Sequence, residues 1–498
     1  MPADGQRRRA GLLLHPTSLP GDLGSGELGP EAFRWLEFLE QAGQRLWQVL
    51  PLGPTGYGDS PYQSLSSFAG NPLLISLELL RDRGLLSDDE LEPLRRLPQD
   101  RISFGELIPL RGRLLDLAAG RLLAAGEPAA FREFCVREAD WLEDYVLFSA
   151  LKAANGGAAW LDWPEGERLR DPAALQAARE RNAGLLERLR VQQWWFMEQW
   201  TALRAEANRR GIALLGDLPI FVALDSADAW AARELFDLDA SGRPQNVAGV
   251  PPDYFSATGQ RWGNPLYVWE RHARDGFSWW TRRVAHNLRL FDELRIDHFR
   301  GFESFYSIPA EEPTAVRGEW LPGPGLELFR ALEGKLGALP VIAEDLGVIT
   351  PKVDALREAC GFPGMKVLQF AFAGGPEDPY LPHNHVPRSV VYTGTHDNDT
   401  TAGWYATTTE QERDLVRRYF GVADGAAPWA LLRAAQASVA ELAIAPLQDV
   451  LGLGSEGRMN IPGQAGGNWS WRFGWEQPGD WAAAMLRELA TLYGRLPD

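Results

Sequence analysis

The segment RIDHFRG at residues 295–301 is the stretch of this chain best suited to chemistry. It follows a short apolar run, and a fully buried strand does not tolerate so many charged groups, so we expect a strand that ends in an active site. Strand alternation places Arg295 and Asp297 on the same face. A guanidinium beside a carboxylate keeps that carboxylate ionised and lowers its pKa, as a nucleophilic Asp requires.

Two further strand-like runs end in carboxylates. One leads directly into Glu344 and Asp345, and another leads into a loop that holds His396 and Asp397. A single acidic residue in such a place more often caps a helix or a turn. Three equivalent positions favour catalysis instead, because the carboxyl ends of parallel barrel strands lie on one face.

Paired carboxylates are what a retaining glycosidase needs, about 5 Å apart. Asp297 fits the nucleophile, and either Glu344 or Asp345 fits the acid, because neighbouring strand residues face opposite ways. The longer side chain favours Glu344, although spacing does not decide the choice. We expect Asp397 to bind sugar hydroxyls and favour the oxocarbenium-like transition state, with His396 as its neutral hydrogen-bond partner.

The elements that must position these residues alternate between strand and helix. The clearest helix is predicted over residues 350–360, with Thr350 as N-cap, Pro351 in the first turn and Gly361 at the C-terminal stop. The alternation predicts an α/β protein with a (β/α)8 TIM barrel. Eight strand-like runs are predicted, at residues 11–14, 46–50, 212–215, 294–296, 340–343, 367–370, 389–392 and 442–445.

Two long insertions interrupt the predicted barrel, which we assign to one catalytic domain over residues 1–498. Residues 51–211 follow the second strand and carry apolar residues at helical spacing, so mainly helical subdomains are expected there. Residues 216–276 form a second insertion after the third strand, with a predicted lid loop at 246–260. About 50 residues follow the last strand, too few for a C-terminal β-sandwich domain.

Composition excludes several classes of protein. The 50 basic and 67 acidic residues give a net charge of −17, so neither a nucleic acid nor a membrane surface is expected as a partner. No apolar run approaches the roughly 20 residues of a membrane span. The two cysteines, Cys135 and Cys360, fit a reducing compartment, and the first apolar run is too short for a signal peptide. We therefore expect a cytoplasmic protein.

Two polar, aromatic loops are predicted near the site. Residues 53–64 carry Tyr57 and Tyr62, and residues 246–265 carry Trp262. Aromatic rings are natural platforms for sugars, although most of the 20 tryptophans are expected to pack in the core. The second loop is a candidate lid that limits access of water.

No cofactor and no metal is expected. The segment GLGSEG at residues 452–457 matches a dinucleotide fingerprint literally, but the proline and glycine that follow it cannot open a helix. The first loop lacks the ending of a phosphate loop. The His-Asn-His at 383–385 has metal-like spacing without a third ligand nearby.

These motifs resemble the amylomaltases, the bacterial 4-α-glucanotransferases of glycoside hydrolase family seventy-seven. The likeness runs from LLLHPTSLPG at residues 12–21 through the carboxylate segments to RMNIPG at 458–463. It implies that Asp297 is the nucleophile, Glu344 the acid/base and Asp397 the transition-state stabiliser. It also implies a set of substrate-binding residues, namely Tyr57, Ser60, Tyr62, Asp217, Gln260, Trp262, Arg295, His298, His396 and Asn460.

The resemblance further implies an activity. A segment of an α-1,4-glucan would pass to the 4-hydroxyl of another glucan or of glucose, with maltooligosaccharides, amylose, starch or glycogen as substrates and cyclic glucans among the products. From the residues alone, an α-glucan hydrolase or a branching enzyme stays open, since both use the same carboxylates. A hydrolase with structural calcium lacks an Asp-rich loop here. A glucan-binding protein without catalysis would not need three carboxylates.

Overall fold

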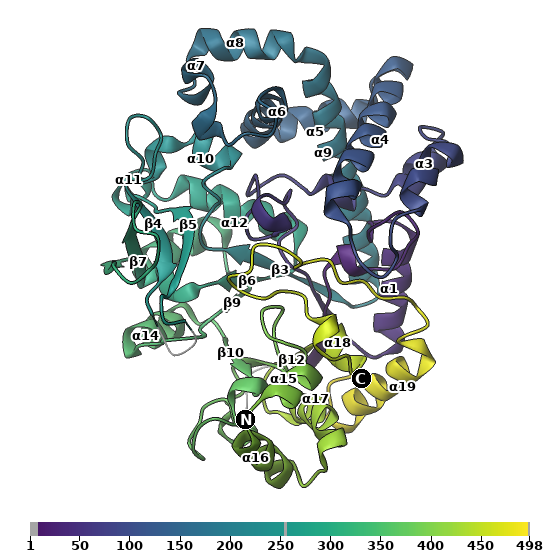
Figure 1. Ribbon diagram of the computed structural model, residues 1–498, viewed down its shortest axis with the longest axis vertical. Coiled ribbons are helices and arrows are strands. Elements are labelled where there is room, and N and C mark those ends of the chain that lie inside the picture. The colour runs from purple at the N-terminus through teal and green to yellow at the C-terminus, as the bar shows by residue number, and fades with distance from the viewer. Residues whose placement is uncertain (1–7, 253–255, 497–498) are drawn as a thin grey trace.

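The computed structural model describes residues 8–252 and 256–496, and its centre is an eight-stranded parallel sheet. The strands are β1 (Arg9–Leu13), β2 (Leu46–Gln48), β3 (Ala213–Pro219), β6 (Glu293–Asp297), β9 (Val341–Ala343), β10 (Gly364–Val367), β11 (Ser389–Tyr392) and β12 (Leu442–Pro446). Their order is β10-β11-β12-β1-β2-β3-β6-β9 (Figure 1). Ala343 N donates to Pro363 O at 2.9 Å, so the two outer strands approach each other and the barrel is nearly closed.

The predicted (β/α)8 barrel is thus confirmed, with two shifts along the chain. Strand β3 runs on to Pro219, so Asp217 lies on the barrel and not in the insertion predicted at 216–276. The sixth strand is Gly364–Val367, and the predicted run 367–370 is wrong because Leu368–Phe370 form a 3₁₀ turn after the strand.

Helices cover the outside of the barrel. Helix α14 (Pro351–Cys360) begins after Thr350 and ends at Gly361 in the left-handed conformation (φ 74°), as predicted. The others around the barrel are α1 (Pro30–Gln41), α12 (Ser278–Leu290), α13 (Gly325–Leu336), α15 (Thr401–Thr407), α16 (Glu410–Phe420), α17 (Ala427–Ala437), α18 (Leu447–Val450) and α19 (Gly479–Leu492). No helix in the described part of the chain is long and apolar enough to cross a membrane.

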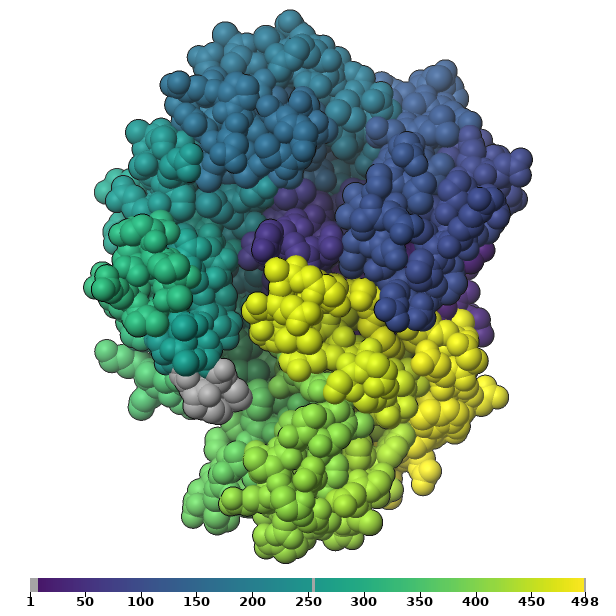
Figure 2. All heavy atoms as spheres, in the orientation of Figure 1, coloured from purple at the N-terminus to yellow at the C-terminus, as the bar shows by residue number. Residues whose placement is uncertain are grey.

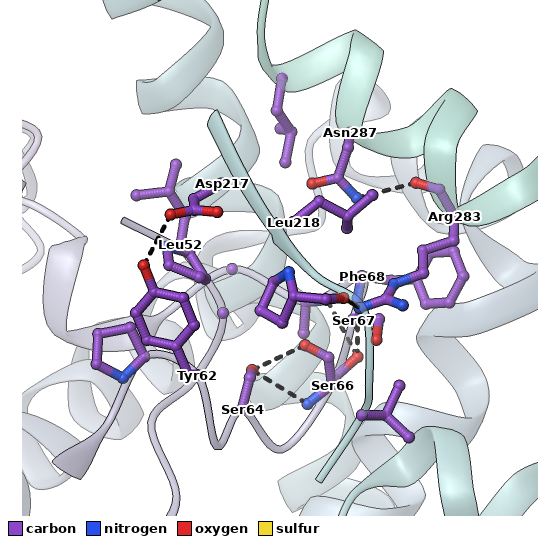
Figure 3. A pocket seen from close by; sticks show the side chains of 18 of the residues that line it. Leu52, Tyr62, Ser64, Ser66, Ser67, Phe68, Asp217, Leu218, Arg283 and Asn287 are labelled. Atoms are coloured by element: carbon purple, nitrogen blue, oxygen red, sulfur yellow. Dashed lines mark hydrogen bonds between the residues drawn. The ribbon is translucent and has the colours of Figure 1, made fainter. Parts of the chain in front are cut away.

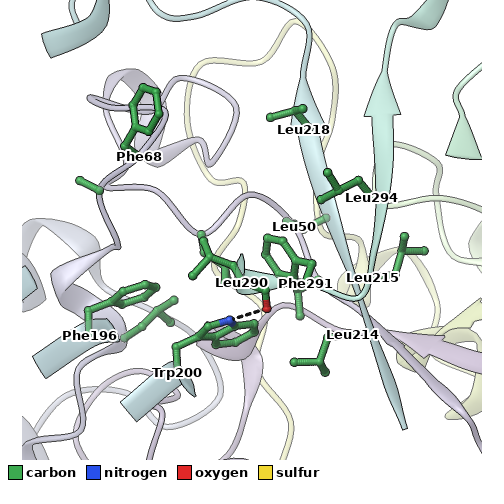
Figure 4. Close-up of a cluster of buried hydrophobic side chains, with 14 of the residues drawn as sticks. Leu50, Phe68, Phe196, Trp200, Leu214, Leu215, Leu218, Leu290, Phe291 and Leu294 are labelled. Atoms are coloured by element: carbon green, nitrogen blue, oxygen red, sulfur yellow. Dashed lines mark hydrogen bonds between the residues drawn. The ribbon is translucent and has the colours of Figure 1, made fainter. Parts of the chain in front are cut away.

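The chain between β2 and β3 is mainly helical. It forms α2 (Leu77–Asp82), α3 (Asp88–Arg95), α4 (Phe104–Ala125), α5 (Ala129–Arg137), α6 (Ala139–Ala154), α7 (Glu165–Arg168), α8 (Pro172–Arg181) and α9 (Ala183–Arg209). Helix α9 joins this insertion to the barrel (Figure 4). Its Trp200 is fully buried against Phe291, and the indole N–H donates to Leu290 O at 2.9 Å.

A second sheet stands beside the barrel (Figure 1). It pairs β5 (Gln260–Pro265), β4 (Asn246–Val250), β7 (Ser304–Pro309) and β8 (Glu319–Pro322) in that order, all antiparallel. The prediction of a loop over residues 246–265 is therefore wrong at both ends of this range, which form strands β4 and β5. Helices α10 (Ala227–Ala231) and α11 (Trp269–Arg274) precede and follow this β4–β5 hairpin in the chain. Residues 253–255 of the predicted lid lie outside the described residues.

We expect Trp200→Ala to destabilise the protein by about 3–5 kcal/mol, because it leaves a cavity where the insertion meets the barrel. The matched control is Trp481→Ala on α19, whose ring is 47% exposed, and we expect it to cost less than about 1 kcal/mol. Thermal unfolding midpoints of the two variants test this difference. Equal midpoints would mean that α9 does not stabilise the barrel through Trp200.

Candidate active site

The three predicted carboxylates stand at the carboxyl ends of barrel strands. Asp297 is the last residue of β6, Glu344 directly follows β9, and Asp397 lies in the loop after β11. Strands β6 and β9 are neighbours, with Ile296 opposite Ala343. The chain therefore brings Asp297 and Glu344 side by side from two adjacent strands.

A single buried guanidinium joins two of the strands. Arg295 is 3% exposed and donates to Asp297 Oδ1 at 2.9 Å and to Asp217 Oδ2 at 2.6 Å. Asp217 lies opposite Arg295 in the β3–β6 register and also accepts from the Tyr62 hydroxyl at 2.7 Å (Figure 3). Arg295 is thus shared between two carboxylates, and the loop at 53–64 is tied to them through Tyr62.

The shared guanidinium does not lower the pKa of Asp297 on balance. The pKa of Asp297 is raised to about 6: burial is the largest cause, Arg295 offsets part of it, and the charges of Asp217 and Asp397 add to the rise. The lowered pKa expected from the sequence is therefore wrong in its net direction. The reason is that the sequence reveals the neighbouring cation but not that Asp297 is buried. It also does not reveal that Arg295 donates to Asp217 as well as to Asp297.

Glu344 is buried and held by backbone amides. Its carboxyl oxygens accept from His298 N at 2.7 Å and from Leu346 N at 2.9 Å. Burial, followed by the charge of Asp297, raises the pKa of Glu344 to about 8. At neutral pH Glu344 therefore keeps its proton while Asp297 is ionised. Burial also lowers the pKa of His298 to about 3, so this imidazole is neutral.

The sequence leaves open a choice between Glu344 and Asp345, and the contacts of Asp345 favour Glu344. Its carboxylate accepts from Met365 N on β10 at 2.6 Å and pairs with Arg357 on α14 at 3.1 Å. Asp345 thus ties β10 and α14 together, and Glu344 is the carboxyl group on which the charge of Asp297 acts.

Asp397 lies in the loop after β11 and is exposed. Asn460 donates to its Oδ1 at 2.6 Å, and His396 Nε2 lies 3.4 Å from the same oxygen. His396 stacks on Tyr62, with ring centroids 5.0 Å apart. Figure 2 shows the C-terminal part of the chain in yellow, lying across the front of the barrel between the blue helical insertion and the green second sheet.

The remaining predicted site residues divide into two groups. Trp262 on β5 contacts the His298 ring edge to face at 4.8 Å and donates to Gln260 Oε1 at 3.1 Å, so the second sheet brings both to the site. Ser60 accepts from Tyr62 N at 3.2 Å and supports the loop. Tyr57 is 77% exposed, and its carbonyl accepts from Ser60 N at 3.4 Å.

Sequence reasoning missed Trp469. Its ring lies 5.9 Å from Tyr62 and 6.0 Å from His396, and its backbone is left-handed (φ 63°). The backbone strain of a bulky residue in this conformation marks a special position. With 20 tryptophans in the chain, residue type alone did not distinguish Trp469. Its position nine residues after Asn460, in the C-terminal segment, is the feature that could have indicated a place near the site.

A cavity of about 50 Å³ lies behind Tyr62 (Figure 3). Asp217, Leu218 and Arg283 line it together with the serines of the loop at 64–67. Among the described residues, no group of three or more His, Cys, Asp or Glu side chains is arranged to hold a metal ion. The imidazoles of His383 and His385 are engaged with Tyr419 and Ser438, each at 2.8 Å.

The site as a whole combines an ionised carboxylate, a protonated carboxylic acid beside it and aromatic rings around both. A parallel barrel with such a pair at adjacent strand ends defines an enzyme that acts on glycosidic bonds. The comparisons with known proteins narrow this class.

The sequence profile of the 4-alpha-glucanotransferase family matches residues 14–476. The chain is 53% identical over 503 residues to a 4-alpha-glucanotransferase of Thermus thermophilus, covering 98% of this chain and 99% of that protein. It is 49% identical over 496 residues to one from a Synechocystis species, covering 98% of each. The structure of an amylomaltase from Streptococcus agalactiae in complex with acarbose matches with a TM-score of 0.95 and 38% identity, over 99% of this chain and 100% of that one. The chain belongs to the 4-alpha-glucanotransferase family.

We expect Asp217→Asn to lower the pKa of Asp297, because it removes a negative charge that raises this pKa and leaves Arg295 with one carboxylate. The low-pH limb of the transfer rate should move to lower pH, and kcat should fall roughly 10- to 100-fold as Arg295 shifts. Tyr62→Phe is the control, because it keeps both the ring and the charge of Asp217. A limb that stays in place in Asp217→Asn would contradict the sharing of Arg295 between the two carboxylates.

Proposed function

We propose that this 4-alpha-glucanotransferase works by retaining double displacement, with Asp297 and Glu344 as the reacting pair. Asp297 attacks the anomeric carbon of an α-1,4-glucan while Glu344 protonates the departing glycosidic oxygen, which leaves a covalent glucosyl-enzyme. Glu344 then takes the proton of a 4-hydroxyl from a second glucan, and that oxygen displaces Asp297. The observation that carries the proposal is the placement of two buried carboxyl groups at the ends of adjacent strands, β6 and β9, where their pKa values are raised to different extents.

The surrounding residues have supporting roles in this proposal. Arg295 orients Asp297, and Asp397 with Asn460 and His396 holds hydroxyls of the reacting sugar. The glucan meets rings and polar groups of Tyr62, Trp262, Gln260 and His298. Tyr57 and Ser60 lie on the loop that carries Tyr62, and Asp217 lies behind Tyr62. Trp469 extends the aromatic wall beside Tyr62.

Transfer without hydrolysis requires that sugar, and not water, reaches the covalent intermediate. We assign this task to the β4–β5 hairpin, which carries the lid segment at 246–260, and to the loop that carries Tyr62. We also propose a cytoplasmic location, in keeping with two free thiols at Cys135 and Cys360 and no disulfide among the described residues.

Incubation with maltotriose tests the function directly. We expect a ladder of longer maltodextrins together with glucose and maltose, while the total concentration of reducing ends stays constant because each transfer breaks and forms one bond. Chromatography and a reducing-end assay measure the two quantities. Rising reducing ends without a ladder would identify a hydrolase, and branched products would identify a branching enzyme.

We expect Asp297→Ala to lose at least about 1,000-fold in kcat with the fold intact, since no other carboxylate can form the covalent intermediate. Circular dichroism and the thermal midpoint report on the fold. The control is Glu358→Gln on the exposed face of α14, which should keep full activity. An active Asp297→Ala variant would remove Asp297 from the mechanism.

The pH dependence of kcat/KM on maltotriose should be bell-shaped. Asp297 must be ionised, so activity is lost as the pH falls through about 6; Glu344 must be protonated, so activity is lost as the pH rises through about 8. Glu344→Gln should reduce the rate roughly 100- to 10,000-fold and abolish the high-pH limb. A high-pH limb that survives this substitution would assign it to another group.

A further inference from the structure

The loop that follows Glu344 has an exposed apex with few contacts. Leu346 N donates to the Glu344 carboxyl, and the loop ends where Thr350 caps α14. Between them, Gly347 is left-handed (φ 84°), no atom lies within 4 Å of the position that a Cβ would take there, and Val348 is 63% exposed. Leu346 and Ile349 on either side pack against the hydrophobic core, but packing does not hold the apex between them.

One buried arginine contacts this apex. Arg300 lies three residues after Asp297 in the 3₁₀ turn Phe299–Phe302 and is 6% exposed. Its Nη1 donates to Val348 O, and its guanidinium carbon lies 3.8 Å from the ring centroid of Trp320 on β8. Among the described residues, no carboxylate forms an ion pair with Arg300 and its Nε has no hydrogen-bond partner.

Such a cation is costly to bury. Burial lowers the pKa of Arg300, and the charge of Glu303 offsets only part of the effect. A planar guanidinium differs from an apolar side chain in that it can stack on an indole and donate a hydrogen bond in a fixed direction at the same time. At Arg300 that direction is the carbonyl at the apex of the acid's loop.

We propose that Arg300 is a positioning residue for the acid/base: held flat against Trp320, it fixes the Val348 carbonyl and thereby the loop that orients Glu344. The inference rests on the proposed role of Glu344. It links the turn that follows the nucleophile to the loop that follows the acid, with the second sheet as the support.

Release of this loop has a specific consequence for the acid. The groups that act on Glu344 are Asp297 and Arg295 on β6 and the backbone amides of His298 and Leu346. A freed loop admits water and so weakens burial, the largest cause of the raised pKa of Glu344. Loss of the Leu346 amide, which lowers this pKa, offsets only part of that effect, so the net shift of the pKa is downward. Proton donation to a sugar leaving group suffers, whereas attack by Asp297 does not.

Two donors separate these effects. Maltotriose needs its leaving oxygen protonated, but α-maltosyl fluoride does not: Asp297 forms the bond to the anomeric carbon and fluoride departs with the electron pair of the broken bond. For Arg300→Met we expect kcat on maltotriose to fall about 10- to 100-fold with KM little changed, while the fluoride burst of the first turnover slows less than about threefold. The high-pH limb on maltotriose should move to lower pH.

Further variants keep the test independent of folding defects. Trp320→Ala, on an exposed strand, should reproduce part of the shift of the high-pH limb. Trp320→Phe should return the limb toward its wild-type position, because a ring face remains for Arg300 to stack on. Arg472→Met is the matched control, since Arg472 is similarly buried and donates to the carbonyls of Leu19 and Gly21 away from the acid. A burst that slows as much as maltotriose turnover, or an unmoved limb, would overturn the role of Arg300.

Glu344→Gln distinguishes this inference from the proposed function. If it loses maltotriose turnover and retains the fluoride burst, Glu344 is the acid, and the Arg300 variants then decide the inference alone. If it retains maltotriose turnover, the proposed role of Glu344 fails, and the positioning role of Arg300 fails with it.

Discussion

The buried guanidinium of Arg295 is the contact on which the rest of the site depends. It bridges β3 and β6 by donating to Asp217 and Asp297, and through Asp217 it reaches the hydroxyl of Tyr62. A buried charge left unpaired costs several kcal/mol, so the register of the two strands and the position of the Tyr62 loop are fixed together. The local order of the site is thereby built into the barrel and does not wait for substrate.

Burial sets the protonation of Asp297 and Glu344. The barrel alone would leave the strand ends open to water. Three parts of the chain outside the barrel cover them: the helical insertion behind the Tyr62 loop, the second sheet with Trp262, and the C-terminal segment with Asn460 (Figure 2). Desolvation raises the pKa values of Asp297 and Glu344 alike. The difference between them comes from neighbouring charges: Arg295 offsets part of the rise at Asp297, whereas the charge of Asp297 raises the pKa of Glu344 further.

Local patterns were enough to predict the strand ends with their carboxylates and helix α14, because each depends on residues adjacent in the chain. The second sheet was not predictable in this way, since β4 pairs with β7 across the intervening barrel strand β6. Trp469 was missed for the same reason: its value lies in contacts with Tyr62 and His396, both distant in sequence. The pKa of Asp297 was misjudged because burial is a property of the whole fold. The motifs were thus enough to predict which strand ends carry carboxylates, but not the electrostatics of those carboxylates.

The mutual repulsion of the pair also explains how one carboxyl group can serve both halves of the proposed reaction. The negative charge of Asp297 is one of the causes that raise the pKa of Glu344. Formation of the glucosyl ester removes that charge, so the pKa of Glu344 falls at the step where the group must change from acid to base. Arg295 meanwhile keeps Asp217 as its partner and stays in place. The return of the charge to Asp297 on transfer then raises the pKa again, and Glu344 is protonated for the next donor.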